Sequence, residues 1–306
     1  MLVLLTLISA AASQLIPWHA PTALPAWQAA LGNWGRWYDA ALFTAALLLV
    51  VGGHELAHLW RARRHGLAAG VPYLLPAPTL VGTLGGVMAL RERPRTRAQL
   101  LDIALAGPIV GATLATAAMG LGLELSTAAT AQFSGDAPQH WGNGYILHNR
   151  FVLGTSLLMW AIDFAVGPES AWVVLHPVAL AGWTGGLMTS VSLMPAAQLD
   201  GGHIAYALFG RRHVWFAAAA GMALAMTGLL GVGGKQGWVW AVVGAFVALG
   251  SRHHPGVDMP QRPVSRKQQC AGALGLVVWI AAWVPIPVQA IETAAVVMPM
   301  HSGIGS

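Results

Sequence analysis

The stretch His54-Glu55-Leu56-Ala57-His58 lies near the end of a run that is apolar from Ala40 onward. Two helical residues four positions apart project from the same face, one turn above the other. That spacing suits two nitrogen ligands on one zinc ion, and it leaves the intervening glutamate free to act on water. Charged groups inside a helix that is long enough to enter a bilayer are usually functional. This stretch therefore predicts a zinc site within a membrane helix.

The composition places the whole chain in a lipid bilayer. Of the 306 residues, 56% are hydrophobic and only 9% are charged, whereas soluble domains carry roughly 25% charged residues. The formal net charge of +5 comes from short basic clusters between apolar segments, which is the pattern of positive-inside loops. We therefore exclude nucleic acid as a partner. The single cysteine, Cys270, excludes an internal disulfide and a cysteine-rich metal site.

We expect an all-α polytopic membrane protein with about six transmembrane helices. Residues 1–37 form an N-terminal helix and an interfacial loop, residues 38–212 a catalytic membrane core, and residues 213–306 C-terminal helices and a tail. Residues 1–16 favour a retained helix over a cleaved signal peptide, because no basic segment precedes them. The segments 40–60, 100–123 and 171–194 and the apolar runs after Arg212 are the expected spans.

Residues 71–90 differ from these spans because prolines and glycines interrupt them. Extended backbone at membrane depth is tolerated only where protein covers it or where it lines a cavity. We predict a re-entrant β-hairpin-like element here, near the active site. Residues 124–150 are expected to form a polar loop, and residues 151–166 an interfacial or re-entrant segment that does not span the membrane.

The basic clusters predict the topology. Most of the 16 basic residues fall in four clusters, after Leu59, Leu90, Gly210 and Gly250. If all four lie on the cytoplasmic side, His58 and Asp200 both come near cytoplasmic helix ends, an agreement that the charge count does not assume.

Two histidines leave a catalytic zinc site one ligand short. The chain has 11 acidic residues, and most lie on the opposite side or beside arginines, where Glu92 and Asp102 are expected to form caps or ion pairs. Asp163 is possible, and Glu292 in the unplaced tail is only weakly excluded. Asp200 is favoured because it follows Pro195, which interrupts a helix, and a carboxylate in an apolar chain is costly unless something pairs with it.

These motifs resemble those of the site-2 protease family of intramembrane zinc metalloproteases, in the bacterial and plastid branch without a PDZ domain. His54 to His58 matches its first motif, and the stretch from Pro195 to Gly201 matches the end of its second, Asn-x-x-Pro-x-x-x-Leu-Asp-Gly. Ala106-Gly107-Pro108 and Gly82-Thr83-Leu84-Gly85 are further matches. The likeness covers roughly residues 40–210. One position departs from the pattern: Ser192 stands where the family has asparagine.

The resemblance implies one zinc ion per chain, bound by His54, His58 and Asp200, with Glu55 activating the zinc-bound water. Ser192 stands at the family position that helps to hold the substrate or the transition state, and Gly85 and Gly86 are further candidates for that role. The implied substrate is a single-span transmembrane regulator, already cut by an upstream site-1-type protease. The implied location is a bacterial inner membrane, with the site near the cytoplasmic side.

Other interpretations stay open for several of these features. The His, Glu and Asp cluster could serve a metal-ion transporter, and Ser192 leaves room for an inactive scaffold. A structural role is expected for His203, three residues after Asp200, and His254 is expected to belong to a basic loop. Ala106-Gly107-Pro108 is expected to provide packing and a kink, or else to shape the wall of the active site.

Overall fold

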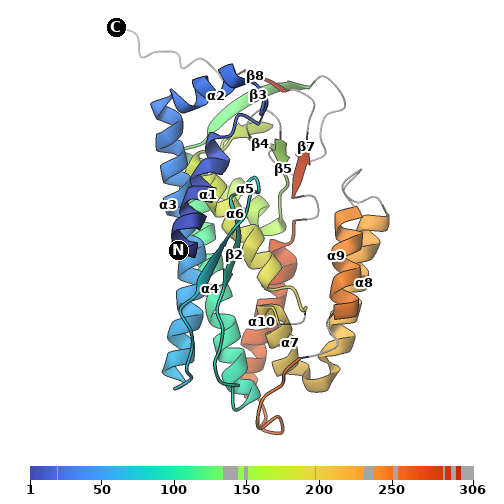
Figure 1. Cartoon of the computed structure of the whole chain (residues 1–306). Coiled ribbons are helices and arrows are strands. Elements are labelled where there is room, and N and C mark those ends of the chain that lie inside the picture. Colours follow the sequence, from blue (N-terminus) through green and yellow to red (C-terminus); the bar gives the residue numbers. More distant parts are fainter. Residues whose placement is uncertain are drawn as a thin grey trace.

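A bundle of helices of unequal length forms the body of the molecule, with a small sheet at one end (Figure 1). The computed structural model describes residues 1–18, 20–133, 144–147, 151–196, 198–230, 238–250, 254–284, 287–290 and 294–297. The helices are α1 (Leu2–Leu15), α2 (Leu24–Leu31), α3 (Trp34–Arg64), α4 (Arg97–Glu124), α5 (Leu157–Val166), α6 (Pro177–Ser192), α7 (Asp200–Phe209), the 3-10 turn η1 (Gly210–Arg212), α8 (His213–Leu229), α9 (Trp238–Gly250) and α10 (Arg266–Ala282). The strands are β1 (Tyr73–Pro76), β2 (Thr83–Val87), β3 (Thr127–Phe133), β4 (Gly144–Leu147), β5 (Phe151–Leu153), β6 (Trp172–Val174), β7 (Val288–Ala290) and β8 (Ala294–Val297).

Helix α3 carries the zinc motif and is longer than the expected span. It has 31 residues, or about 46 Å at 1.5 Å per residue. The side chain of Asn33 caps its first turn by accepting hydrogen bonds from the backbone N–H groups of Gly35 and Arg36. Three arginines lie in its last turn, where cations offset the negative end of the helix dipole.

Helices α4 and α6 pack closely against each other because small residues face across their contact. A Cβ atom on Gly122 would overlap the backbone of Ala179, and one on Gly182 would overlap the backbone of Met119. Trp183 of α6 is fully buried, and its indole N–H donates to the carbonyl of Gly154 at 2.7 Å. These contacts fix the two helices that flank the zinc motif.

The segment between α3 and α4 contains the hairpin that its prolines and glycines predicted. β1 and β2 pair antiparallel, with Leu74 opposite Gly86 and an irregularity between Leu74 and Pro76. Gly82 and Gly85 have positive φ angles of 75° and 99°, a region that side chains disfavour. The hairpin is thus present, while its re-entrant position in a membrane stays a prediction.

The expectation of an all-α chain was wrong in one respect, because a six-stranded sheet lies at one end of the bundle (Figure 1). Its order is β7-β5-β4-β6-β3-β8, and only the β4–β6 pair among these is parallel. Several of its strands have only three or four residues, too few to show a period in the sequence. β3 and β4 lie in the segment expected to be a polar loop. Glu292 lies outside the described residues.

Two helices within the described part of the chain, α3 and α4, are long and apolar enough to cross a membrane. α1, α6, α8, α9 and α10 have 13–17 residues, or about 20–26 Å, less than the roughly 30 Å hydrocarbon core. The count of about six spans therefore stays a prediction. α5 has ten residues, which agrees with the expectation that residues 151–166 do not span.

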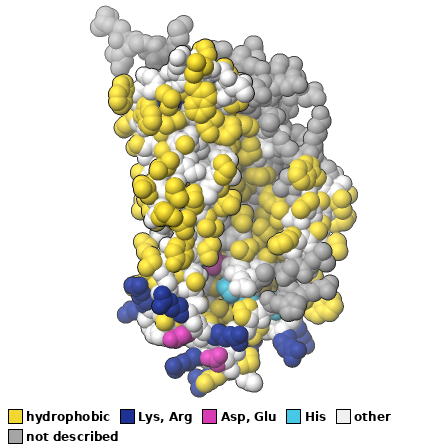
Figure 2. Space-filling model, in the orientation of Figure 1, with side chains coloured by type: hydrophobic (Ala, Val, Ile, Leu, Met, Phe, Trp, Pro, Cys, Tyr) yellow, Lys and Arg dark blue, Asp and Glu magenta, His cyan; other side chains and the backbone are white. Residues whose placement is uncertain are grey.

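The surface of the molecule exposes large apolar side chains, and its basic side chains gather at one end (Figure 2). Large apolar side chains are exposed, among them Leu49 at 63%, Trp215 at 78% and Phe246 at 77%, which suits contact with lipid rather than with water. Lys and Arg side chains gather at one end of the molecule (Figure 2). Hydrogen bonds join the basic segments there: the backbone N–H of Met259 donates to the carbonyl of Arg95, and Arg97 donates to the carbonyl of Ala207. Arg252 of the fourth cluster lies outside the described residues.

Candidate metal centre

Helix α3 brings His54 and His58 together, one turn apart, near its basic end. Their Nε2 atoms lie 3.2 Å apart, and their ring centroids are 4.9 Å apart. His58 is buried, with 6% of its surface exposed. The i, i+4 spacing alone determines this geometry, because an unbroken helix places both imidazoles on one face. The pair is the arrangement that the sequence predicted.

Asp200 reaches the same point from a second, interrupted helix. α6 ends at Ser192, the chain turns through the buried segment 193–196, and Asp200 opens α7. Its Oδ2 lies 3.2 Å from His54 Nε2, and its Oδ1 lies 3.2 Å from His58 Nε2. A carboxylate in the first turn of a helix is favoured by the helix dipole. Gly201 permits this turn, because a Cβ atom there would overlap the carbonyl of Leu193.

The three side chains fit a zinc ion by donor chemistry and by spacing. His58 donates its Nδ1–H to the carbonyl of Ile103 at 2.9 Å, so a neutral His58 turns an unprotonated Nε2 toward Asp200 and His54. A tetrahedral zinc ion with bonds of about 2.0–2.1 Å to nitrogen holds its ligand atoms about 3.3 Å apart. The separations of 3.2 Å agree with this. Among the described residues, this is the one group of three or more candidate ligands.

Glu55 lies beside the two histidines on α3 and is buried, with 6% of its surface exposed. Its side chain packs against Gly86 of β2, where a Cβ atom would come within 2.5 Å of Glu55 Cγ and 2.8 Å of Oε1. Within the described residues its carboxylate forms no hydrogen bond, so it is available to a water molecule or a substrate. The hairpin thus passes directly alongside the Glu55 carboxylate.

Two glycines of α4 form a wall against the histidines. A Cβ atom on Gly107 would overlap the His58 imidazole, and one on Gly111 would lie 2.7 Å from His54 Nδ1. Gly111 had no assigned role in the sequence analysis, and Gly107 was placed there within a packing motif. The signal for both was Ala106-Gly107-Pro108-Ile109-Val110-Gly111, two glycines one helical turn apart. The structure shows the close packing that this motif predicted, here against the two histidines, while its role in shaping the wall of an active site stays a prediction.

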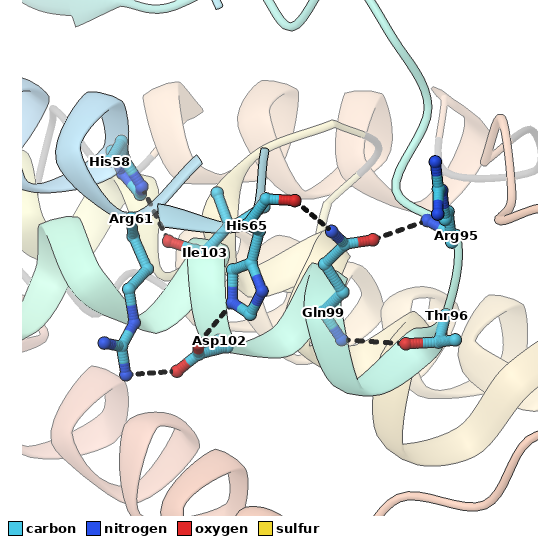
Figure 3. Close-up of polar contacts among 8 residues, drawn as sticks. All are labelled: His58, Arg61, His65, Arg95, Thr96, Gln99, Asp102 and Ile103. Carbon is cyan, nitrogen blue, oxygen red and sulfur yellow. Dashed lines mark hydrogen bonds and ion pairs between the residues drawn. The ribbon is translucent and has the colours of Figure 1, made fainter. Parts of the chain in front are cut away.

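A polar network holds the start of α4 against the end of α3 (Figure 3). Asp102 pairs with Arg61 at 2.6 Å and with His65 at 2.5 Å, as its position beside basic residues predicted. Ile103, the next residue, supplies the carbonyl that accepts from His58. Gln99 extends the network to the backbone of His65 and Arg95. The ion pairs therefore position the backbone carbonyl that orients the His58 imidazole.

Three predicted site residues remain. Gly86 lies against the Glu55 side chain, whereas Ser192 and Gly85 form hydrogen bonds with residues near them in the sequence. Ser192 is the last residue of α6, and its hydroxyl donates to the carbonyl of Thr189 at 3.0 Å. The backbone N–H of Gly85 donates to the hydroxyl of Thr83 at 3.1 Å. A role for Ser192 or Gly85 toward the substrate stays a prediction.

Known proteins are similar in sequence to this chain. The sequence model of peptidase family M50 matches residues 42–232. The chain is 29% identical over 215 residues to "Probable zinc metalloprotease EGY2, chloroplastic" of Oryza sativa subsp. indica, which covers 69% of this chain and 36% of the relative. It is 30% identical over 210 residues to "Probable zinc metalloprotease EGY1, chloroplastic" of Arabidopsis thaliana. That match covers 67% of this chain and 36% of the relative.

The match to these relatives is partial. The chain spans about a third of the length of these relatives. No solved structure matches the chain. The M50 match nevertheless covers more than half of the chain and includes His54, Glu55, His58 and Asp200, and the chain therefore belongs to peptidase family M50.

Proposed function

We propose that this chain is an intramembrane zinc endopeptidase that cleaves transmembrane segments of membrane-anchored regulatory proteins. The observation that carries the proposal is that His54, His58 and Asp200 converge beside Glu55. Both histidines and Glu55 lie on α3, an apolar helix long enough to cross a membrane. Relatives named as zinc metalloproteases support the choice of metal.

The residues divide the chemistry between them. His54, His58 and Asp200 would hold zinc, which supplies a Lewis acid that polarises a carbonyl and makes water acidic enough to react near neutral pH. Glu55 takes the proton from the attacking water and gives it to the nitrogen of the departing amine. Gly107 and Gly111 let α4 pack directly against the two imidazoles, where a side chain would overlap them.

The substrate must present an extended backbone, because a helical peptide bond is shielded by its own hydrogen bonds. The β1–β2 hairpin has two strands and hence an unpaired edge on each side. β2 passes Glu55 at Gly86, and Leu84 and Val87 on this strand are exposed at 68% and 52%. We propose that an unwound apolar segment adds to this hairpin as a further strand.

The proposed setting is a multi-pass protein of a bacterial inner membrane, with the basic end in the cytoplasm. The proposed substrates are single-span proteins that a first, site-1-type protease has already shortened. The regions 1–37, 38–212 and 213–306 remain our division of the chain. A metal-ion transporter is less well supported, because the described residues hold one ligand group rather than a series along a path. An inactive scaffold has Ser192 as its only support.

The deciding experiment compares the wild type with Glu55→Gln in full-length purified protein. We expect both to retain zinc, and we expect only the wild type to cleave a reporter with a single transmembrane segment. Zinc uptake into vesicles without any cleavage would contradict the proposal and favour the transporter.

Strand addition has a separate test at Leu84. Leu84→Pro removes a backbone N–H from the hairpin, whereas Leu84→Ala keeps it. We expect the proline variant alone to lose most cleavage while retaining zinc. Equal cleavage by the two variants would remove this part of the proposal.

A further inference from the structure

A second pair of histidines joins α7 to the loop 254–265. His203 Nδ1 lies 2.7 Å from His254 Nε2, although 51 residues separate the two in sequence. The ring of His254 also stacks on Tyr206 of α7, with centroids 4.1 Å apart and planes 7° from parallel. Two side chains of the helix that begins at Asp200 therefore hold one loop imidazole in a fixed orientation.

The backbone of the loop determines where the protons of this pair lie. The backbone N–H of Gly256 donates to His254 Nδ1 at 2.9 Å, so that nitrogen carries no proton. His254 must then be protonated on Nε2, from which it donates to His203 Nδ1. His203 in turn must carry its proton on Nε2. Burial, together with the neighbouring His203 and His213, lowers the pKa of His254 to about 3, which agrees with a neutral ring.

In this tautomer His203 cannot serve as a metal ligand. His203 lies on α7 one turn after Asp200 and on the same face, and it interacts electrostatically with Asp200 and His58. A protonated Nε2 has no lone pair for a metal. Its N–H forms no hydrogen bond within the described residues, and the other nitrogen of the ring is already bound to the loop. The free N–H thus lies on the side of the ring that faces away from His254.

We propose that His203 is a catalytic hydrogen-bond donor, whose Nε2–H binds the oxygen of the scissile peptide carbonyl and stabilises the negative charge that develops there. His254 and Gly256 act as positioning residues, because they keep the donating proton on Nε2. No proton is transferred by His203 in this role. The inference rests on the proposed peptidase activity, and it replaces the structural role that the sequence suggested for His203.

The kinetic test uses two substitutions of His203 in the full-length protein in lipid nanodiscs. Leucine removes the donor, whereas glutamine places an amide N–H near the former Nε2. We expect His203→Leu to lower kcat for the transmembrane reporter about 100-fold, as for loss of one oxyanion donor, with KM and zinc content unchanged. We expect His203→Gln to restore at least a tenth of the wild-type kcat. Loss of zinc from His203→Leu, or an unchanged kcat, would overturn the proposal.

The tautomer has its own readout, independent of cleavage. We expect imidazole ¹⁵N spectra of the histidine-labelled protein to show His203 neutral and protonated on Nε2, with the signals assigned by their absence in His203→Leu. We expect His254→Phe to release this preference and to lower kcat several-fold. A cationic His203, or one protonated on Nδ1, would contradict the proposal. A wild type that cleaves nothing would instead contradict the peptidase activity itself.

Discussion

The two sides of the metal centre are built in different ways. On one side, α3 supplies His54, Glu55 and His58 within a single turn of one unbroken helix. On the other side, Asp200 comes from 146 residues farther along the chain, after a break between α6 and α7. The α3 side is therefore arranged by local helical geometry, whereas the α7 side depends on tertiary contacts such as those of Leu193 and the loop 254–265. Substitutions should reveal this difference.

The largest effect is expected from Asp200→Asn, which keeps the shape of the side chain and removes its charge. Loss of an outer-shell partner costs about 10–100-fold in metal affinity, so we expect the loss of a ligand charge to exceed about 100-fold. The measurement is zinc affinity by chelator competition in the purified protein. Asp258→Asn, in an exposed loop, is the control. If Asp200→Asn bound zinc like the wild type, the metal centre would consist of the α3 side alone.

The next largest effect is expected where α4 closes on the α3 side. In Gly107→Ala the added methyl group would overlap the His58 imidazole, and overpacking typically costs about 1–3 kcal/mol. We expect zinc affinity to fall about 30-fold, which corresponds to about 2 kcal/mol, the middle of that range. Gly120→Ala on the same helix meets only Ile162 Cγ2, at 3.8 Å, and should bind zinc normally. Equal affinities for the two variants would show that the residues around Gly107 can shift to accommodate a methyl group.

A smaller effect is expected from Asp102→Asn, which tests whether the ion pairs shown in Figure 3 position His58. Asp102 and Arg61 are partly exposed, at 27% and 36% of their side-chain surfaces, and exposed ion pairs contribute at most about 1 kcal/mol. We therefore expect a reduction in zinc affinity of at most about fivefold, decreasing as salt is added. Glu124→Gln at the other end of α4 is the control. A reduction that salt does not alter would argue against the ion pairs.

The comparison also explains what the sequence could predict. The spacing of His54 and His58 is a local property of a helix, and Asp200 could be selected because few carboxylates lie in apolar segments. Both predictions rest on short-range patterns. The hydrogen bond between His203 and His254 and the contact between Gly107 and His58 join distant segments, and no local pattern encodes them. The six-stranded sheet was missed for a related reason, because strands as short as β5 and β6 acquire their identity from pairing.

The smallest effect is expected from Ser192→Ala, at the point where α6 ends before the α7 side begins. Its hydroxyl already donates to the carbonyl of Thr189, so Ser192→Ala should change kcat by less than about twofold. Ser192→Asn extends an amide beyond that bond, and one added hydrogen bond contributes about 0.5–1.5 kcal/mol. We therefore expect kcat for the reporter to rise by up to about tenfold, with zinc content unchanged. A fall in kcat would mean that the surroundings of Ser192 are adapted to serine, and that the α7 side has diverged from the family pattern while the α3 side has kept it.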